Sequence, residues 1–565
     1  MQFSSKTLSQ TVTKLCLDKG IDHIVISPGS RNAALTIGFT GNESFTNFSI
    51  VDERCAAFFA LGLAQQLQRP VALVCTSGSA LLNYYPAIAE AYYSDVPLVI
   101  LSADRPAHLL EIGDGQTIKQ KNVFANHILF NGACKEGDTH QSYNEDQIHT
   151  ALSVAINQSG PVHINLPFSE PLYETVKTPS VFPECQAIVE IQETASPALI
   201  SEIASHWNAS SKKMILTGVL APNSLEVEVI SQLAENPSVV VLTETTSNVH
   251  HSNFFPAIDQ LIAPLDDSDF KALQPEVLIT FGGMVVSKKI KKLLRDYPPK
   301  VHYHIDSKKA FDTYFCLTKH VPCSPNHFFR EFLSHTQKTI STYQQDWLRV
   351  KNQRLQKHDL YLKEIPFSDF LVFSQLFKTL PDNIQLQLSN SSTIRYGQLF
   401  EMNPSHAVFC NRGTSGIDGS TSTAIGAAHV CETPTVFITG DLSFFYDSNA
   451  LWNQYIASDF KIIIINNSGG GIFRILPDAK GVPSFSTFFE TKHQLTAKQL
   501  SEMHGFGYQS ANDMPSLMAQ LASFFGNSDT PQILEIFTPS EINDDVLLSY
   551  FDYIKYLSDL SFLAN

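Results

Sequence analysis

Short runs of β-branched and aliphatic residues alternate with helix-length amphipathic segments along the whole chain. Continuous apolar strands separated by helices are typical of parallel sheets that are covered by helices on both faces. The pattern predicts an α/β fold built from three doubly wound parallel-sheet domains. The predicted strands are residues 23–27, 49–52, 71–75, 98–101 and 162–165, then 214–216, 239–242, 277–280 and 301–305, and finally 384–388, 407–410, 435–438, 462–465 and 533–537.

The length of 565 residues is too great for one hydrophobic core and suggests about three domains. A proline-rich stretch over 171–183 and a charged, helical-looking segment over 337–363 are the best candidates for the boundaries. We therefore expect domains over residues 1–180, 190–340 and 365–565.

An internal repeat relates the first and last thirds of the chain. Residues 69–104 align without gaps with residues 433–468, so that Pro70 falls on Pro434 and the Ser-Asp pairs of the two copies coincide. Each copy predicts a strand, a helix and a second strand, which is a βαβ unit. Two unrelated βαβ units can look alike, but the equal spacing favours homologous first and third domains that flank a different middle domain.

The two copies differ where a ligand would bind. In doubly wound sheets, ligands bind beyond the carboxyl ends of the strands. Asp441 and Asn467 occupy these positions in the third domain, whereas Ser77 and Ala103 occupy them in the first. Only the third domain therefore offers the charge and the amide of a metal site.

Oxygen donors near these strand ends fit a hard divalent cation. Mg²⁺ takes a few oxygen ligands from protein and the rest from water and phosphates. Asp441 offers a carboxylate, Asn467 an amide oxygen, and Gly469 a backbone carbonyl with no side chain in the way. Ser443 could add a hydroxyl to a diphosphate. Turn capping is the plain alternative for Asp and Asn, and a dinucleotide loop is disfavoured because G-x-G-x-x-G is absent from this register.

Charge and cysteine content narrow the class of protein. The net charge of -16 argues against nucleic acid or an anionic membrane as the main partner, although a few local cations could still bind a small anion. The nine cysteines include no C-x-x-C pair, which indicates a reducing compartment. The start of the chain lacks the apolar stretch of a signal peptide, and no apolar run is long enough for membrane insertion. We expect a cytoplasmic protein.

The segment Gly440-Asp441, followed after an apolar βα segment by Asn466-Asn467, resembles the motif of thiamine-diphosphate enzymes, which reads G-D-G and then N-N. Leu442 replaces the third glycine. This departure is a feature of one branch, the 2-succinyl-5-enolpyruvyl-6-hydroxy-3-cyclohexene-1-carboxylate synthase family of menaquinone biosynthesis. Other segments resemble that family in the same order: residues 27–32, 52–54, 76–78, 103–106, 116 with 120, 411–413, 415–419 and 470–473. The resemblance covers essentially the whole chain, with the middle domain its weakest part.

The resemblance implies a fold, cofactors and an assembly. It implies an N-terminal pyrimidine-binding domain, a central Rossmann-like domain and a C-terminal diphosphate-binding domain. It also implies thiamine diphosphate with Mg²⁺ or Mn²⁺, and a homodimer whose site lies between the first domain of one subunit and the third domain of the other. Whether dimers pair into tetramers stays open.

The implied activity is that of a transferase. 2-Oxoglutarate is decarboxylated, and the resulting succinyl semialdehyde carbanion adds in conjugate fashion to isochorismate. Glu53 matches the glutamate that activates the cofactor. The implied cofactor-binding residues are Glu53, Ser391, Arg412, Ile417, Gly440, Asp441, Ser443, Asn467, Gly469, Ile472 and Phe473, with Asp441, Asn467 and Gly469 as metal ligands. The implied substrate-binding residues are Ser30, Arg31, Arg105, Gln116, Lys288, Ser391, Arg395 and Arg412.

Several alternatives stay open. Another thiamine-dependent 2-oxoacid enzyme, a carboligase or a simple decarboxylase, would share the metal motif but need fewer arginines in its cleft. A Rossmann-like sensor without turnover is disfavoured by Glu53. Lys288 opens a charge run, so Lys289 is an alternative substrate contact. Arg395 lies four residues after Ser391, so both can face one cleft.

Overall fold

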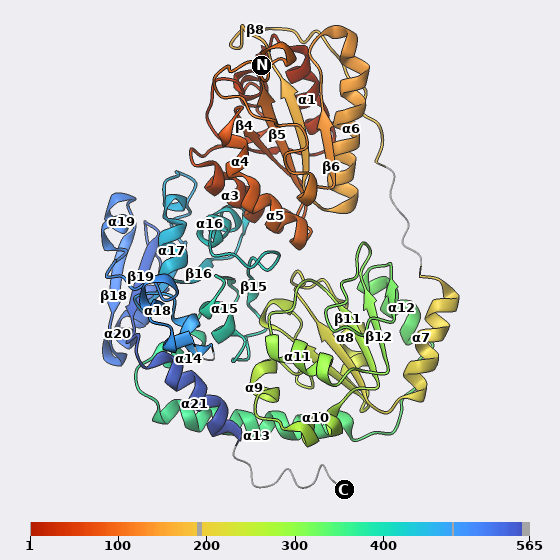
Figure 1. Cartoon of the computed structure of the whole chain (residues 1–565), viewed down its shortest axis with the longest axis vertical. Coiled ribbons are helices and arrows are strands. Elements are labelled where there is room, and N and C mark those ends of the chain that lie inside the picture. Colours follow the sequence, from red (N-terminus) through yellow and green to blue (C-terminus); the bar gives the residue numbers. More distant parts are fainter. Residues whose placement is uncertain (1, 189–194, 477–478, 556–565) are drawn as a thin grey trace.

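The computed structural model describes residues 2–188, 195–476 and 479–555, which fold into three parallel sheets with helices on both faces (Figure 1). A short antiparallel ribbon pairs β1 (Phe3–Ser4) with β8 (Thr175–Val176). The α/β class predicted from the apolar pattern is confirmed. In these ranges, no helix combines the length and the apolar content that crossing a membrane requires.

The N-terminal sheet has the order β3-β2-β4-β5-β7-β6. Its strands are β2 (His23–Ile26), β3 (Thr46–Ser49), β4 (Val71–Cys75), β5 (Leu98–Asp104), β6 (Phe130–Ala133) and β7 (Val162–Pro167). Its helices are α1 (Thr7–Asp18), α2 (Ala33–Thr40), α3 (Glu53–Leu67), α4 (Ser79–Asn83), α5 (Tyr85–Ser94) and α6 (Gln141–Gln158).

The middle sheet has the order β10-β9-β11-β12-β13. Its strands are β9 (Lys213–Thr217), β10 (Val239–Thr243), β11 (Val277–Phe281), β12 (Val301–Ile305) and β13 (Lys319–Val321). Its helices are α7 (Pro197–Ala209), α8 (Val227–Ala234), α9 (Ile258–Ile262), α10 (Asp267–Leu273), α11 (Lys288–Asp296) and α12 (Pro325–Leu333). The long helix α13 (Tyr343–Glu364) then leads to the last sheet (Figure 1).

The C-terminal sheet has the order β15-β14-β16-β17-β19-β18. Its strands are β14 (Gln385–Leu388), β15 (Ala407–Phe409), β16 (Thr435–Gly440), β17 (Lys461–Asn466), β18 (Gly507–Ala511) and β19 (Gln532–Phe537). Its helices are α14 (Asp369–Thr379), α15 (Ser392–Gly397), α16 (Ser420–Val430), α17 (Asp441–Tyr446), α18 (Phe485–Phe488), α19 (Lys498–Met503), α20 (Met514–Phe524) and α21 (Asn543–Lys555).

The N-terminal and C-terminal sheets share one topology. Numbered within each sheet in chain order, both have the order 2-1-3-4-6-5, whereas the middle sheet has the order 2-1-3-4-5. The strands of the sequence repeat, β4 and β5 in one sheet and β16 and β17 in the other, hold the same two central places. The topology therefore agrees with the repeat seen in the sequence.

Helices α3 and α16 join the N-terminal and C-terminal sheets. A Cβ atom on Gly62 would lie 2.1 Å from the carbonyl oxygen of Thr423, and one on Gly426 would lie 2.1 Å from that of Phe59. Because both contacts are with backbone atoms, only glycine lets the helices approach this closely. The buried side chains of the two helices form one hydrophobic cluster with the two sheets.

The strand predicted over residues 49–52 is wrong in its position. Strand β3 ends at Ser49, and Val51 is 48% exposed. The Asp52 side chain accepts hydrogen bonds from the backbone N–H groups of Arg54 and Cys55, at 3.0 and 3.2 Å. This N-cap satisfies the free donors of α3, so Glu53 begins a helix rather than ending a strand.

Three strands of the parallel sheets were missed, and each lies at the edge of its sheet. These are β6, β13 and β18, with the sequences FNGA, KHV and GYQSA. Edge strands are partly solvated and need no continuous apolar run, so the hydrophobic pattern could not find them.

Candidate functional site

The predicted metal ligands meet at the carboxyl ends of β16 and β17. The two strands pair in parallel, with Gly440 opposite Ile465. The residues that follow them therefore leave the sheet at the same edge, and Asp441 begins α17 while Asn467 lies just beyond β17. This pairing brings together residues that are far apart in the sequence.

Asp441 is a buried carboxylate that organises the loop after β17. Its Oδ1 accepts a hydrogen bond from the N–H of Leu442 at 2.7 Å, and its Oδ2 accepts one from the N–H of Gly469 at 2.9 Å. The ring Nε2 of His493 lies 3.2 Å from the same Oδ2. No sequence pattern singles out His493, which comes from the segment after α18.

Asn467 has one end of its amide satisfied and the other free. Its Nδ2 donates to Oδ2 of Asp369 at 2.8 Å. Its Oδ1 is buried and, within the described residues, accepts no hydrogen bond. An unpaired buried acceptor is costly unless a ligand completes it, so this oxygen is a good candidate for a cation ligand.

Asp369, the first residue of α14, fixes the orientation of that amide. Its Oδ1 accepts a hydrogen bond from the Thr538 hydroxyl at 2.5 Å, and its backbone N–H donates to Oδ1 of Asn543 at 2.9 Å. Burial raises the pKa of Asp369 to about 6, and the neighbouring charge of Asp441 acts in the same direction. An acceptor held this firmly keeps the Nδ2 end of Asn467 turned toward it, and hence the oxygen turned away.

Gly469 occupies a backbone conformation that suits glycine alone. Its φ is +146°, and a Cβ atom there would lie 2.5 Å from the carbonyl oxygen of Glu490. The carboxylate, amide oxygen and backbone carbonyl of Asp441, Asn467 and Gly469 form the all-oxygen donor set that Mg²⁺ or Mn²⁺ accepts. Over the described ranges, no cluster of three His, Cys, Asp or Glu side chains offers an alternative metal site. The residues present therefore fit a diphosphate-bound divalent cation.

Further predicted residues line the same edge of the C-terminal sheet. The Ser443 hydroxyl donates to the carbonyl oxygen of Ile417 at 3.1 Å. Ile472 and Phe473 lie on a short 3-10 helix, Gly471–Ile475, directly after the glycine run. Ser443, Ile472 and Phe473 therefore lie on the segments that follow β16 and β17, at the edge that carries Asp441.

Two arginines lie beside this group without a full set of partners. Arg395 donates from Nη1 to the carbonyl oxygen of Ser391 at 3.0 Å, one helical turn back, and Arg412 donates from Nη1 to Oδ1 of Asn390 at 2.6 Å. Burial, and then the charge of Arg412, lowers the pKa of Arg395. Nε of Arg412 is buried and has no hydrogen-bond acceptor among the described residues. Two cations this close favour an anion between them.

Helix α11 brings lysines toward these arginines. Lys288 and Lys289 are exposed, and Lys291 is half-buried. Burial lowers the pKa of Lys291; the charge of Glu244 opposes this shift, and the charge of Arg412 adds to it. The charges of Lys289 and Arg395 both act on the Asp259 carboxyl, so both side chains lie near it. The α11 side chains near the two arginines are thus Lys289 and Lys291, and Lys288 adjoins them.

The remaining predicted residues gather at the carboxyl edge of the N-terminal sheet. Arg31 donates from Nη1 to the carbonyl oxygen of Phe168 at 2.9 Å, and Nε of Arg31 is buried without a partner among the described residues. Burial, and then the charge of Arg105, lowers the pKa of Arg31. Ser30 and Gln116 are exposed at this edge, where Ser30 accepts a hydrogen bond from the Tyr173 hydroxyl at 3.3 Å.

Glu53 also belongs to this N-terminal edge. It is half-buried, and Oε2 accepts a hydrogen bond from Nδ2 of Asn83 at 3.4 Å. The predicted residues thus form an N-terminal group (Ser30, Arg31, Glu53, Arg105 and Gln116) and a C-terminal group (Ser391, Arg395, Arg412, Ile417, Gly440, Asp441, Ser443, Asn467, Gly469, Ile472 and Phe473). Within the described ranges of one chain, no hydrogen bond or ion pair joins the two groups.

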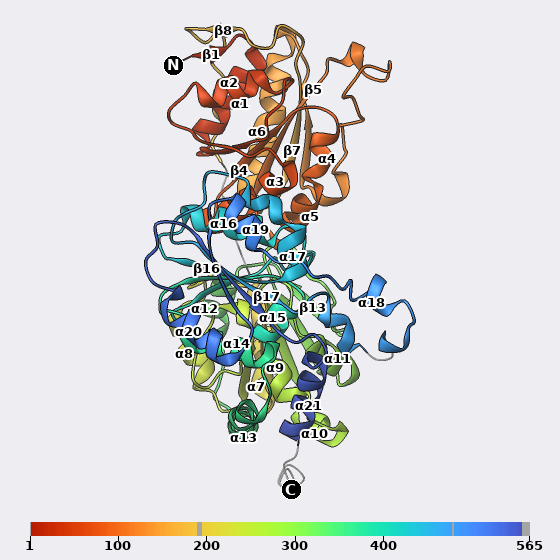
Figure 2. The same cartoon turned by 90° about the vertical axis from the view of Figure 1, so that its left-hand side faces the viewer.

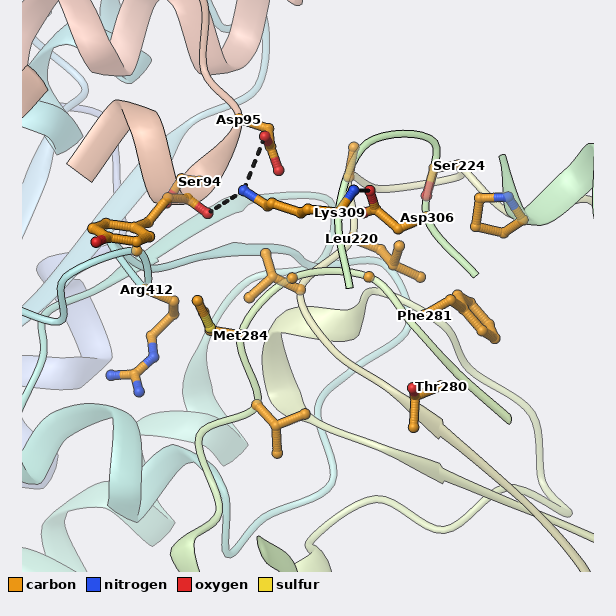
Figure 3. Close-up of a pocket in the computed structure, with 18 of the residues that line it drawn as sticks. Ser94, Asp95, Leu220, Ser224, Thr280, Phe281, Met284, Asp306, Lys309 and Arg412 are labelled. Carbon is orange, nitrogen blue, oxygen red and sulfur yellow. Dashed lines mark hydrogen bonds and ion pairs between the residues drawn. The ribbon is translucent and has the colours of Figure 1, made fainter. Parts of the chain in front are cut away.

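A cavity of about 410 Å³ lies where the three sheets meet (Figure 3). Its walls include Ser94 and Asp95 at the end of α5, Lys309 after β12, and Arg412 from the C-terminal group. Lys309 donates from Nζ to Oδ1 of Asp95 at 3.1 Å, as Figure 3 shows. Arg412 therefore lines this cavity and also lies near Arg395.

Four residues that the sequence did not reveal contact the predicted site residues or the loop that carries Arg412, namely Asp369, Asn390, Glu90 and His493. Asp369, Glu90 and His493 come from distant stretches of the chain, whereas Asn390 directly precedes the predicted residue Ser391, and none belongs to a spacing pattern that marks a ligand site. Only the fold brings them to the motif residues.

Known proteins resemble this chain over nearly its whole length. Residues 6–127 match the thiamine pyrophosphate enzyme N-terminal TPP binding domain, and residues 391–536 match the C-terminal TPP binding domain of the same enzymes. A solved structure of benzoylformate decarboxylase from Polynucleobacter necessarius covers 94% of this chain and 99% of its own, with a TM-score of 0.70. At 16% identity, this likeness shows the fold alone.

Curated relatives named 2-succinyl-5-enolpyruvyl-6-hydroxy-3-cyclohexene-1-carboxylate synthase are much more similar. The Flavobacterium johnsoniae protein is 54% identical over 98% of this chain and 99% of its own length. The Flavobacterium psychrophilum protein is 55% identical over 96% and 98%, and that of Porphyromonas gingivalis is 36% identical over 95% of both. The chain belongs to the 2-succinyl-5-enolpyruvyl-6-hydroxy-3-cyclohexene-1-carboxylate synthase family of thiamine-diphosphate enzymes.

Proposed function

We propose that this chain catalyses the synthase reaction of its family, in which 2-oxoglutarate is decarboxylated and the remaining four-carbon unit adds to isochorismate, as a step of menaquinone biosynthesis. The observation that carries the proposal is the 54% identity to a synthase over 98% of the chain. The two TPP binding domain matches support thiamine diphosphate as the cofactor.

The C-terminal group would hold the cofactor diphosphate and its metal. Asp441, Asn467 and Gly469 would ligate Mg²⁺ or Mn²⁺, and the free Oδ1 of Asn467 supports this assignment. The Ser443 hydroxyl and the 3-10 helix after the glycine run would contact the diphosphate, and the Ile417 side chain would pack against the cofactor. Bound thiamine diphosphate supplies an electron sink for a carbanion at the former keto carbon.

The arginines would bind the carboxylates of both substrates. A guanidinium pairs with a carboxylate through two parallel hydrogen bonds, which lysine cannot match. The buried Nε atoms of Arg31 and Arg412 are free to make such bonds in the described structure. Four arginines, two at each edge, suit a dicarboxylate donor and an anionic acceptor better than they suit a monocarboxylate such as pyruvate.

We also propose that two chains form the complete site. Glu53 would reach the pyrimidine ring of a cofactor held by the partner, where it would hold the proton at the ring nitrogen. Exposed apolar side chains flank both groups, including Val51 and Leu82 near Glu53 and Phe488 after the glycine run, on the segment that projects in Figure 2. A partner chain that completes the site would cover these side chains.

Mixing two inactive variants tests this shared site. Homodimers of Glu53→Gln and of Asp441→Ala should each be nearly inactive. After they are unfolded or dissociated together and reassembled, half of the dimers are mixed and each has one intact site, so about a quarter of wild-type activity should return. If each chain forms its own site, both sites of a mixed dimer are defective and no activity returns.

The reaction itself is tested by supplying each substrate separately. With Mg²⁺, thiamine diphosphate and 2-oxoglutarate, rapid CO₂ release should require isochorismate, and isochorismate should disappear in equal amount. A simple decarboxylase would release CO₂ at the same rate without isochorismate. That result would leave the cofactor assignment intact but refute the carboligase reaction.

We further propose that the three sheets correspond to domains with boundaries near residues 1–180, 190–340 and 365–565. We place the enzyme in the cytoplasm because its nine cysteines include no C-x-x-C pair, which indicates a reducing compartment.

A further inference from the structure

Glu90, on α5 of the N-terminal sheet, is a buried carboxylate that contacts the loop carrying Arg412. It is 1% exposed. Its Oε1 accepts hydrogen bonds from the N–H of Gly413 at 2.7 Å and from the Ser94 hydroxyl at 2.8 Å. Its Oε2 accepts bonds from the N–H and the hydroxyl of Thr414, at 2.6 and 2.7 Å.

This arrangement requires a carboxylate. All four donors are neutral, each carboxylate oxygen accepts two of them, and in the described chain no lysine or arginine forms an ion pair with Glu90. A glutamine of the same shape has one acceptor oxygen, and its NH₂ group would face two of the donors. Breaking these bonds would leave a buried charge without partners, which costs free energy. The carboxylate therefore holds the loop in place.

The loop is shaped for close contact on that side. A Cβ atom on Gly413 would lie 2.6 Å from the carbonyl oxygen of Glu90 and 2.7 Å from the Ser94 hydroxyl. A backbone atom cannot move aside as a flexible side chain would, so glycine is needed for the approach.

The opposite side of the loop is fixed by Asn390, which follows β14. Its Nδ2 donates to the carbonyl oxygens of Asn411 and Gly416, both at 2.7 Å. Its Oδ1 accepts the bond from Nη1 of Arg412 at 2.6 Å. The loop of residues 411–416 is thus held between Asn390, from its own sheet, and Glu90, from the N-terminal sheet.

We propose that Glu90 is the positioning residue for Arg412, so that the N-terminal region of each chain sets the substrate affinity of the C-terminal group of the same chain. The inference rests on the proposed function of Arg412 as a carboxylate-binding residue. The N-terminal region then contributes in two ways. The edge of its sheet carries Glu53, and its helix α5 holds the loop that carries Arg412. Glu90 itself would touch neither substrate nor cofactor.

The test compares Glu90→Gln with Asp95→Asn in the full-length enzyme loaded with Mg²⁺ and thiamine diphosphate. Asp95 lies at the end of the same helix and accepts hydrogen bonds from Lys308 and Lys309 of the middle sheet, at 2.7 and 3.1 Å. Both variants remove one negative charge from α5 or its C-cap, but only Glu90→Gln affects the Arg412 loop.

We expect Glu90→Gln to raise KM for 2-oxoglutarate and isochorismate about tenfold, the effect of losing one charge-assisted hydrogen bond. We expect kcat to change by less than about threefold, because Glu90 acts on binding rather than on chemistry. Affinity for thiamine diphosphate should stay unchanged, and hydrogen exchange should accelerate at the amides of Gly413 and Thr414. Asp95→Asn should change neither KM nor the exchange of those amides.

A KM in Glu90→Gln equal to that of the wild type overturns the proposal, even if the loop amides exchange faster. If Glu90→Gln does not fold, Thr414→Val, which removes one of the four donors, should raise KM in the same direction by a smaller factor, and an unchanged KM there has the same meaning. Arg412→Ala separates the two proposals. If KM rises in Arg412→Ala but not in Glu90→Gln, only the role of Glu90 is refuted. If KM is unchanged in Arg412→Ala, the assigned role of Arg412 is refuted.

Discussion

Replacing Asp441 by alanine is expected to abolish retention of the divalent metal and of thiamine diphosphate, and carboligase activity with it. The variant removes the one carboxylate of the proposed ligand set and also the acceptor that holds the N–H of Gly469. Both the charge that binds the cation and the backbone position of a second ligand are lost. Mn²⁺ binding, measured by electron paramagnetic resonance with thiamine diphosphate present, should weaken by more than about a hundredfold, beyond the usual effect of losing a residue that only orients a ligand.

Asp369→Asn provides a graded comparison for this result. It leaves all three proposed ligands in place but replaces a pure acceptor with an amide that can also donate to Oδ1 of Asn467, so Mn²⁺ binding should weaken by about 10- to 100-fold. Thr538→Val removes a different hydrogen-bond partner of Asp369 and leaves the bond to Asn467, so it should have a smaller effect. Full cofactor occupancy in Asp441→Ala would place the metal site elsewhere in the molecule.

The positions of the metal-site candidates could be predicted because two simple rules combine there. Apolar runs fix where β16 and β17 end, and parallel pairing brings those ends to one edge. Asp441, Asn467 and Gly469 all lie within a few residues of such an end. The predicted edge therefore needed no knowledge of long-range packing.

The residues that support this edge could not be predicted in the same way. Asp369 lies 98 residues before Asn467, and Glu90 lies 323 residues before Gly413. Nothing in the spacing of such residues distinguishes them from ordinary helix residues, since their role depends on how α14 and α5 pack. Glu53 lies at the carboxyl edge of the N-terminal sheet, but the strand predicted over residues 49–52 was wrong because the capping preference of Asp52 outweighs the apolar character of residues 50–51.

Glu53→Gln should retain the cofactor while slowing its activation. Glutamine preserves the size of the side chain and can still accept the hydrogen bond from Asn83, so the N-terminal edge should stay intact. It cannot hold the proton at the pyrimidine nitrogen as a carboxylate does, and general acid–base groups contribute about 10²- to 10⁴-fold to rate. We expect kcat to fall by that factor while Mn²⁺ and thiamine diphosphate binding stay near those of the wild type.

The decisive measurement is exchange of the thiazolium C2 proton with deuterium, followed by NMR after acid quench, without substrate. This exchange reports the step that Glu53 would assist and is independent of the arginines that bind substrate. Asp52→Asn is the matched control, because asparagine caps a helix as well as aspartate does and the same charge is lost one residue away. Exchange should slow in Glu53→Gln and not in Asp52→Asn. If exchange in Glu53→Gln is as fast as in the wild type, the carboxylate takes no part in cofactor activation, and the case for a site shared between two chains loses its N-terminal catalytic residue.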